Sequence, residues 1–215
     1  MRKLKKAKER QRKLSRTKSS TPNYDKELYL KKNSRAQKIT KQELYEGNFI
    51  KNAINKAKNF IQTSIKDIKK NAQKILNDFK REYMSGKKPS NFLPGKMLAM
   101  NYRAKDATKK FDKNPLIICL GPPKNKELQK THTFGLNLHW LPAKDRVTIA
   151  SFFVELLDKR NGKLRYEDVK PFMYKFKGSP VLRMYIIKNI GSRVIEMPSE
   201  AFLTASAIPS EKWVN

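Results

Sequence analysis

Residues Thr133–Pro142 read TFGLNLHWLP and combine two structural signals in one short segment. Every second side chain up to Trp140 is large and apolar, which is the period of a strand with one buried face. Pro142 has the fixed φ that suits the first turn of a helix, and an apolar-rich segment follows it to about Lys159. The stretch therefore predicts a half-buried strand over 133–141 that leads directly into a helix.

The segments around this stretch predict an α+β fold. Three of them are strand-like: Lys96–Arg103, Pro115–Leu120 and Ser192–Met197. Further helices are predicted over Tyr166–Phe176 and from Pro198, and Val181–Ile190 is apolar enough for either a helix or a strand. Together these segments predict a compact domain over 90–215 with a short antiparallel sheet and three or four helices.

A second pattern runs from Ile50 to Tyr83, where apolar residues recur in steps of three and four. The mean step of about 3.67 residues hardly drifts around a straight α-helix. It predicts one long amphipathic helix within 40–86, with a capping box at Thr40–Glu43 and a glycine and proline stop at Ser85–Ser90. A helix over roughly 48–84 would be about 55 Å long, which is more than a small domain can cover completely.

The charge of the chain is strongly positive and uneven. Lysine and arginine total 49 against 19 acidic residues, a formal net charge of +30, and residues 1–90 hold 27 of the basic residues and 8 of the acidic ones. The positive charges of the first segment, 1–39, repel one another, and this pattern predicts an extended basic arm. The partner that this charge favours is a polyanion, because each lysine–phosphate contact releases counterions without reading base sequence.

We therefore predict that the arm and part of the long helix bind nucleic acid through its phosphates. The predicted nucleic-acid-binding residues are Arg2, Lys3, Lys5, Lys6, Lys8, Arg10, Arg12, Lys13, Arg16, Lys18, Lys31, Lys32, Arg35, Lys38, Lys66, Lys69, Lys70 and Lys74. The apolar stripe of the helix has two alternatives, a neighbouring protein or the chain's own domain. The predicted partner-packing residues are Ile50, Ile54, Ile61, Ile65, Ile68, Ile75 and Phe79. Aromatic residues between lysines, near Tyr102–Lys113 and Tyr166–Lys177, are either base-stacking or core residues.

Residue types that carry catalytic chemistry are sparse. His139 has no serine or cysteine nucleophile with an orienting acid nearby, so a hydrogen-bonded structural histidine is predicted. Cys119 lies in the apolar run PLIICLG, which predicts a buried, inert thiol. No spacing brings the candidate magnesium ligands together: Asp106, Asp112, Asp145, Glu155 and Asp158. We predict no enzymatic activity, no metal and no cofactor, and no membrane partner because no segment is apolar enough to span a bilayer.

Four motifs of the rear half resemble a known family. The motifs are Gly95-Lys96-Met97, Phe111–Leu116 (FDKNPL), Gly135–Pro142 (GLNLHWLP) and Arg193–Pro198 (RVIEMP). In this order they resemble small virion proteins of large tailed bacteriophages, the DNA end protector proteins of T-even-type phages. The resemblance covers about 95–200 and leaves the basic front half unmatched.

Charge and resemblance together lead to one main expectation. It is a structural virion protein of a tailed bacteriophage at the portal, neck or genome end, which binds double-stranded DNA non-specifically for DNA end protection or head completion. Its expected partners are DNA, portal, neck or tail proteins and further copies of itself, in the virion and in the host cytoplasm during assembly. Two alternatives stay open: a tail, baseplate or other capsid-assembly protein that binds acidic protein surfaces without DNA, and an RNA-binding subunit of a ribosome-like particle.

Overall fold

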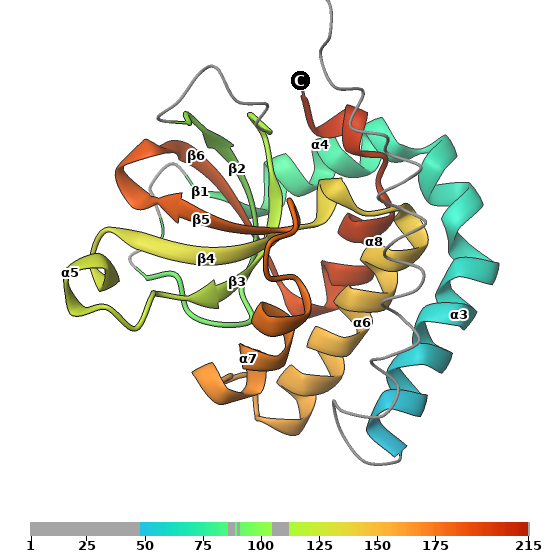
Figure 1. Cartoon of the computed structure of the whole chain (residues 1–215). Coiled ribbons are helices and arrows are strands. Elements are labelled where there is room, and N and C mark those ends of the chain that lie inside the picture. The colour runs from blue at the N-terminus through green and yellow to red at the C-terminus, as the bar shows by residue number, and fades with distance from the viewer. Residues whose placement is uncertain (1–47, 86–88, 90, 105–111, 215) are drawn as a thin grey trace, which may run out of the picture. The chain divides into compact units, whose positions relative to one another are not determined.

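The computed structural model describes residues 48–85, 89, 91–104 and 112–214. All of these residues lie in one compact unit, in which helices pack against an antiparallel sheet (Figure 1). The predicted α+β class is confirmed. The predicted arm, with its phosphate-binding residues from Arg2 to Lys38, and the capping box at Thr40–Glu43 lie outside the described residues.

The strands of the described residues form one six-stranded sheet in the order β1-β6-β2-β3-β4-β5, and every neighbouring pair is antiparallel. The strands are β1 (Met84–Ser85), β2 (Met97–Tyr102), β3 (Leu116–Gly121), β4 (His132–Asn137), β5 (Leu182–Ile186) and β6 (Ile190–Met197). The undecided segment Val181–Ile190 is thus mainly strand β5, followed by the short 3-10 turn η2 (Ile187–Asn189).

The helices of the described residues are α3 (Asn48–Lys70), α4 (Ala72–Tyr83), α5 (Lys126–Gln129), α6 (Ala143–Lys159), α7 (Tyr166–Lys175) and α8 (Phe202–Ala207). Three more 3-10 turns are η1 (Leu138–Trp140), η3 (Ser199–Ala201) and η4 (Ser210–Val214). The helices predicted after Pro142 and over Tyr166–Phe176 are α6 and α7, and the helix start predicted at Pro198 leads through η3 into α8.

Strand β4 is shorter and more deeply buried than its alternating sequence predicted. It ends at Asn137, whose side-chain Oδ1 accepts a hydrogen bond from the N–H of His139 at 3.1 Å and turns the chain into η1. Thr133 and Asn137 are buried along with Leu136 on the opposite face, so the prediction of a half-buried strand was wrong. Both faces are covered because helices pack on one side of the sheet and an apolar cluster around Tyr185 fills the other.

Two glycines of the family-like motifs have structural roles. Gly95 has φ +90°, and a Cβ there would lie 2.8 Å from Cδ1 of Leu164. At Gly135, a Cβ would lie 3.1 Å from Cδ1 of Ile117 and 3.2 Å from the ring of Tyr185. Glycine at these positions therefore lets the backbone enter β2 and lets β4 pass close to the buried cluster.

The connection between β5 and β6 shows that the sheet is strongly curled. Strands β2, β3 and β4 lie between them in the sheet order, which in a flat sheet would separate β5 from β6 by roughly 19 Å. The three residues of η2 rise only about 2 Å each. The end of β5 consequently reaches the end of β2: the N–H of Ile186 donates to Oη of Tyr102 at 3.3 Å, and the N–H of Arg103 donates to the carbonyl of Asn189 at 3.0 Å.

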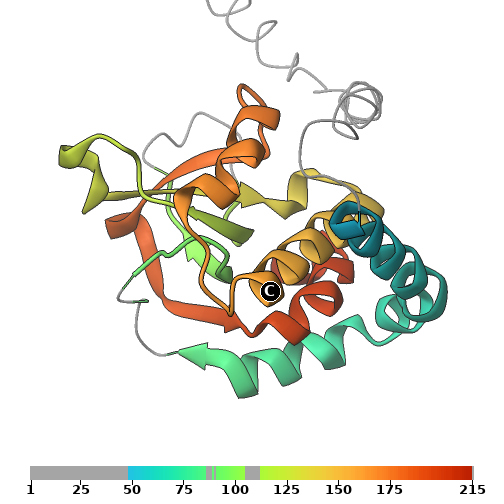
Figure 2. The same cartoon turned by 90° about the horizontal axis from the view of Figure 1, so that it is seen from below.

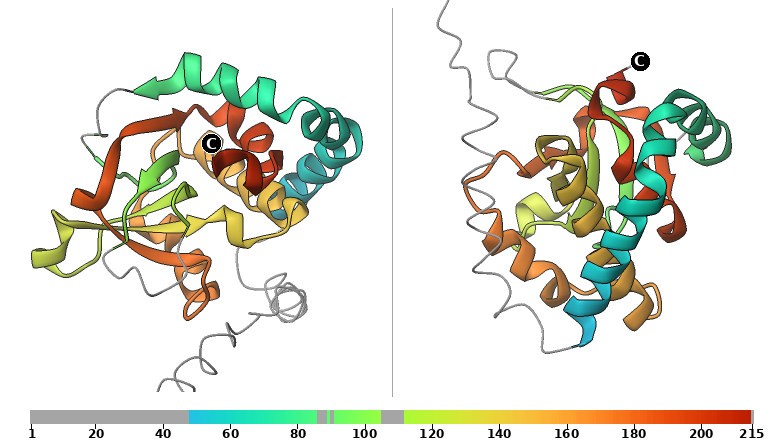
Figure 3. Two further views of the ribbon diagram at one scale, coloured as in Figure 1. Left: turned by 90° about the horizontal axis from the view of Figure 1, so that it is seen from above. Right: turned by 90° about the vertical axis from the view of Figure 1, so that its right-hand side faces the viewer.

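The long helix predicted over about 48–84 is two helices that meet at Asn71. The backbone hydrogen bonds continue, since the N–H of Asn71 donates to Asp67 at 2.9 Å and the N–H of Ile75 donates to Asn71 at 3.1 Å. Asn71 itself has φ −102° and ψ 14°, so the helix bends there. The bend lets α3 pack on α6 and α8 while α4 packs on β6 and η4 (Figure 2, Figure 3). A helix too long to be covered when straight thereby follows the surface of its own domain.

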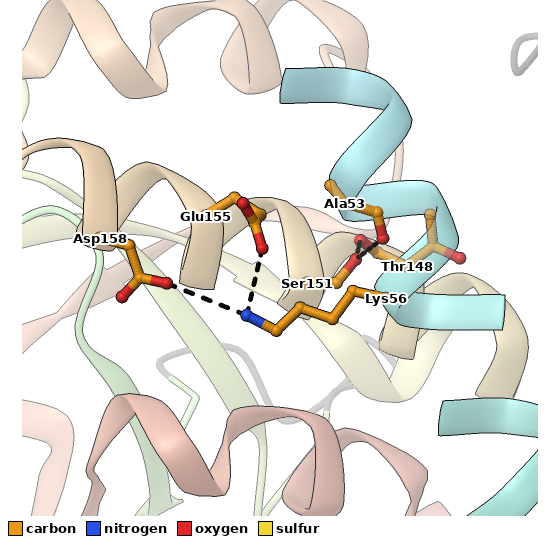
Figure 4. Close-up of polar contacts among 6 residues, drawn as sticks. All are labelled: Ala53, Lys56, Thr148, Ser151, Glu155 and Asp158. Atoms are coloured by element: carbon orange, nitrogen blue, oxygen red, sulfur yellow. Dashed lines mark hydrogen bonds and ion pairs between the residues drawn. The ribbon is translucent and has the colours of Figure 1, made fainter. Parts of the chain in front are cut away.

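The buried stripe of α3 and α4 is centred on small residues beside the isoleucines. Its buried members are Ala53, Ala57, Ile68, Ala72, Leu76 and Phe79. The remaining predicted partner-packing residues are half-buried: Ile50, Ile54, Ile61, Ile65 and Ile75. Alanine lets the backbones of α3 and α6 approach so closely that Oγ of Ser151 donates to the carbonyl of Ala53 at 2.8 Å (Figure 4). Ile68 and Phe79 are core residues of the chain itself.

Candidate nucleic-acid interface

The exposed side of α3 and the start of α4 carries a row of lysines, which we call the lysine ridge: Lys66, Lys69, Lys70 and Lys74. Lys66, Lys70 and Lys74 follow at intervals of four residues, so they share one side of the helix across the bend. Like charges at this spacing destabilise an isolated helix by about 0.2–0.5 kcal/mol per pair. The buried stripe offsets this cost, so the fold holds the lysines in a row despite their mutual repulsion.

Lys56 on the same helix is different, because the protein neutralises its charge. Its Nζ lies 3.1 Å from Oε1 of Glu155 and 3.9 Å from Oδ2 of Asp158, both on α6 (Figure 4). The pair ties α3 to α6 and leaves less charge for an external anion. Lys56 therefore provides an internal comparison for the lysine ridge.

The carboxylates considered as magnesium ligands are not gathered in one site. Glu155 and Asp158 lie beside Lys56, Asp112 binds His139, and Asp145 stands in the first turn of α6. Asp106 lies outside the described residues. Over the part of the chain that the structure describes, no group of three histidine, cysteine, aspartate or glutamate side chains is placed to hold a metal ion.

His139 belongs to a buried hydrogen-bond network, as its sequence context predicted. Its Nδ1 lies 2.7 Å from Oδ2 of Asp112, the same oxygen accepts from Nδ2 of Asn137 at 3.3 Å, and the other carboxylate oxygen accepts from the N–H of Asn114 at 3.0 Å. Burial raises the pKa of Asp112, but the hydrogen bond and charge of His139, together with the hydrogen bonds from Asn114 and Asn137, hold that pKa below its ordinary value. The network ties η1 to the segment before β3, which is an architectural role.

The sequence did not indicate that Asp112 is the partner of His139. The two residues are separated by 27 positions in the sequence, and no spacing rule links a loop carboxylate to a histidine at the end of a different strand. Only the pairing of β3 with β4 brings them together, and the one available signal was the polarity of His139 among apolar neighbours.

A groove opens where η2 lies between the end of β2 and the start of β4, and we call it the mouth groove. Its volume is about 790 Å³. Its walls come from three segments, namely 103–104 after β2, 130–132 at the start of β4, and 186–189 around η2. Basic groups come from Arg103, Lys130, His132 and Lys188, and the apolar lining from Ala104, Ile186 and Ile187. Among the described residues that line the groove there is no carboxylate.

The aromatic residues considered for base stacking, of which Phe111 lies outside the described residues, divide between the core and the surface. Tyr102 is buried and meets the ring of Tyr185 edge-on at 5.0 Å between centroids, and Phe176 is buried as well. Nζ of Lys124 lies 4.9 Å from the ring centre of Tyr166. Tyr174 stays 67% exposed and is the candidate that a base could still reach.

Burial also removes reactive or charged groups from the interface. Cys119 is buried, as predicted, and burial raises the pKa of its thiol to about 12. Burial lowers the pKa of Arg146 to about 10, and this buried cation has little access to a phosphate. Lys175 is only half-buried, and burial lowers its pKa against the opposing effect of Asp145.

Comparison with known proteins identifies one family. A family model described as Phage T4 terminal DNA protecting protein matches residues 5–214. This match agrees with the family that the motifs resembled, but it begins inside the basic arm, so the expectation that the front half is unmatched was wrong. No curated protein and no solved structure matches the chain. None of the described helices is long and apolar enough to cross a membrane.

Proposed function

The chain belongs to the family of the phage T4 terminal DNA protecting protein, and from this premise we propose that it protects DNA ends by covering their phosphates with basic side chains. The observation that carries the proposal is the extent of the match, which spans the basic arm together with the folded unit. The exposed lysine ridge supports it, because a row of cations held outward on a packed helix is suited to a polyanion.

The spacing of the lysine ridge is compatible with a phosphate backbone. Residues four apart on a helix are about 6 Å apart along its axis, and the phosphates of one DNA strand recur about every 3.4 Å along the duplex. Flexible lysine side chains can therefore each reach a phosphate without requiring a particular base. Such contacts position a protein on DNA and carry no sequence information, as protection of any end requires.

We place this activity in the virion, at the genome end near the portal or neck, where it would serve end protection or head completion. The half-buried isoleucines of α3 and α4 that flank the buried stripe are the surface proposed for a neighbouring virion protein. Density for this chain beside the end of the packaged genome in an intact particle is the expected result. Density against an acidic tail or baseplate protein, far from DNA, would instead favour assembly without DNA contact, and copurifying RNA would favour the RNA-binding alternative.

The test of the proposed chemistry is binding and protection of a linear duplex by the full chain over a series of salt concentrations. Protection from an exonuclease is expected, with a log–log slope of affinity against salt of about −0.9 per neutralised phosphate. A chain lacking residues 1–41 should bind with a shallower slope. The deletion must end before α3, because a chain cut at residue 91 would lose the core residues Leu76 and Phe79. A full chain whose affinity does not change with salt would refute phosphate binding.

A further inference from the structure

The mouth groove is held open by backbone hydrogen bonds on two sides. The N–H of Ile187 donates to the carbonyl of Thr131 at 2.9 Å, and the N–H of Arg103 donates to the carbonyl of Asn189 at 3.0 Å. These bonds fix η2 between the start of β4 and the end of β2. The groove is thus a preformed feature of the fold.

The floor of the mouth groove is continuous with the protein core. Ala104 and Ile187 are partly buried and pack against the cluster that contains Tyr102 and Tyr185. Tyr102 also accepts a hydrogen bond from the N–H of Ile186 at 3.3 Å, which fixes the adjoining isoleucine. The floor is therefore a rigid apolar surface that can bury the flat face of a ligand.

The rim of the mouth groove is cationic. Arg103, Lys130 and Lys188 are exposed, and Nδ1 of His132 lies 2.7 Å from Oγ1 of Thr131, which orients that ring. Three positively charged side chains around one opening make the rim complementary to an anion. The site combines cations with an apolar floor, so it suits a ligand that carries both phosphate and an apolar face.

The size of the groove narrows the choice of ligand. Its volume of about 790 Å³ lies in the range of small-ligand sites, roughly 300–1,000 Å³, which suits a few nucleotides and not a length of duplex. Inside a duplex the bases are stacked and paired, so only phosphate and sugar meet a protein surface of this kind. At a strand end a base can leave the stack at lower cost and expose its face.

We propose that the mouth groove binds the end of a DNA strand, with the phosphates at Arg103, Lys130 and Lys188 and the terminal base on Ile186 and Ile187. This inference rests on the proposed function and adds the site that distinguishes an end from the interior of a duplex. An aliphatic floor offers no hydrogen bonds to base edges, so recognition of the end does not depend on its sequence.

The experiment compares binding to a linear duplex with short single-stranded ends and to a covalently closed circle of the same sequence, using the full chain. The groove variant is Lys130→Glu with Lys188→Glu, and the matched control is Lys66→Glu with Lys70→Glu, which changes the net charge equally. The wild-type chain should prefer linear DNA. In the groove variant, the ratio of affinity for linear DNA to affinity for closed circles should be about tenfold lower than in the wild type. The reason is that two charge-assisted phosphate contacts are replaced by repulsion. The control should bind both DNAs more weakly by the same factor and keep its preference.

A second variant tests the floor without changing charge. Ile187→Ala should reduce the preference for linear DNA a few-fold while the salt dependence on closed circles stays as in the wild type. Circular dichroism of each variant establishes that it is folded. Exonuclease protection should fall in the same order as the preference for linear DNA.

Three results would overturn the inference in different ways. A wild-type chain that binds closed and linear DNA equally would remove end recognition and leave the proposed phosphate binding intact. A groove variant whose affinity for linear and closed DNA falls by the same factor would show that the groove is part of a general basic surface. A wild-type chain that binds neither DNA would remove the proposed function together with the groove proposal.

Discussion

The lysine ridge and the mouth groove are both basic, but they are built in opposite ways. The lysine ridge is convex and comes from one stretch of sequence, 66–74, whereas the mouth groove is concave and combines segments near 103, 131 and 187. A row of flexible lysines responds to charge density alone. In our proposal, a groove with an apolar floor would also respond to whether a base is free. Charge would then supply the affinity for DNA, and shape the distinction between its interior and its end.

The two surfaces also depend on the fold differently. The lysine ridge needs only that α3 and α4 stay packed through Ala57, Leu76 and Phe79. The mouth groove needs the sheet to curl until Ile186 of β5 reaches Tyr102 of β2. Four substitutions can separate these requirements, and the expected effects decrease from the first to the last.

The largest effect should come from the support of the lysine ridge. Leu76→Ala removes a fully buried side chain and should lower the free energy of unfolding by about 2–5 kcal/mol, the range for such cavities. Leu93→Ala is the control, since that leucine is 53% exposed and its loss should change stability by less than about 0.5 kcal/mol. Denaturant titration measures both. Equal stability of the two variants would mean that α4 is only loosely attached.

A smaller effect is expected at Asp112, which steadies one wall of the mouth groove. The neighbouring carbonyl of Lys113 accepts from the N–H of Tyr102 at 2.8 Å, directly before Arg103. Asp112→Asn should cost about 1–3 kcal/mol at neutral pH, because the buried partners of the carboxylate lose their charged acceptor. Chemical denaturation of the two proteins at several pH values measures the difference.

The pH dependence of that difference has a defined sign. The pKa of Asp112 is lower in the folded chain than its ordinary value, so the folded state binds fewer protons than the unfolded state. The stabilisation is present above the ordinary carboxyl pKa of about 3.9 and is lost as the pH falls through the folded pKa. Wild type and Asp112→Asn should therefore converge in stability in acid. A difference in unfolding free energy between the two proteins that stays constant as the pH falls through the folded pKa of Asp112 would contradict the role of the carboxylate charge.

A still smaller effect should distinguish a lysine of the ridge from a paired lysine on the same helix. Lys70→Ala should reduce the magnitude of the salt slope for duplex binding by about 0.9, one phosphate contact. Lys56→Ala should leave the slope nearly unchanged, because Glu155 and Asp158 already neutralise Lys56. Titrations of the full chain at several salt concentrations give both slopes. Identical changes in the salt slope for Lys70→Ala and Lys56→Ala would show that binding responds to net charge and not to the position of the lysines.

The smallest effect is the stability cost of Lys56→Ala. The pair with Glu155 is partly exposed, with 42% of the lysine side chain and 21% of the glutamate side chain accessible, so solvent screens it. A loss of about 0.2–1 kcal/mol is expected. Lys58→Ala, at an exposed position of the same helix, is the comparison. A loss above this range would mean that the pair fixes the position of α3 on α6.

Much of the fold followed from local patterns. The periods of three to four over 50–83 and of two around Leu136 predicted helix and strand, and Pro142 marked the start of α6. The positions of the exposed lysines were also predictable, because the polar side of an amphipathic helix must face water when its apolar side is buried.

Other features depended on contacts that no local pattern contains. The centre of the buried stripe moved from the isoleucines to Ala53 and Ala57, because close approach of two helices favours small residues over apolar area. Asn71 bent the long helix so that both halves could pack. Asp112 became the partner of His139 only through strand pairing.

By itself, then, the sequence determined the α+β composition, the surplus of positive charge and the side of the long helix that carries it, because each depends on residues close together in the chain. The tertiary structure alone decided where the helix bends, which carboxylate holds His139, and that Arg103, Lys130 and Lys188 surround one groove. The physical reason is that each of these features joins segments that are far apart in the chain. The groove, for example, needs a curled sheet, in which a three-residue turn connects β5 with β6 although three strands lie between them.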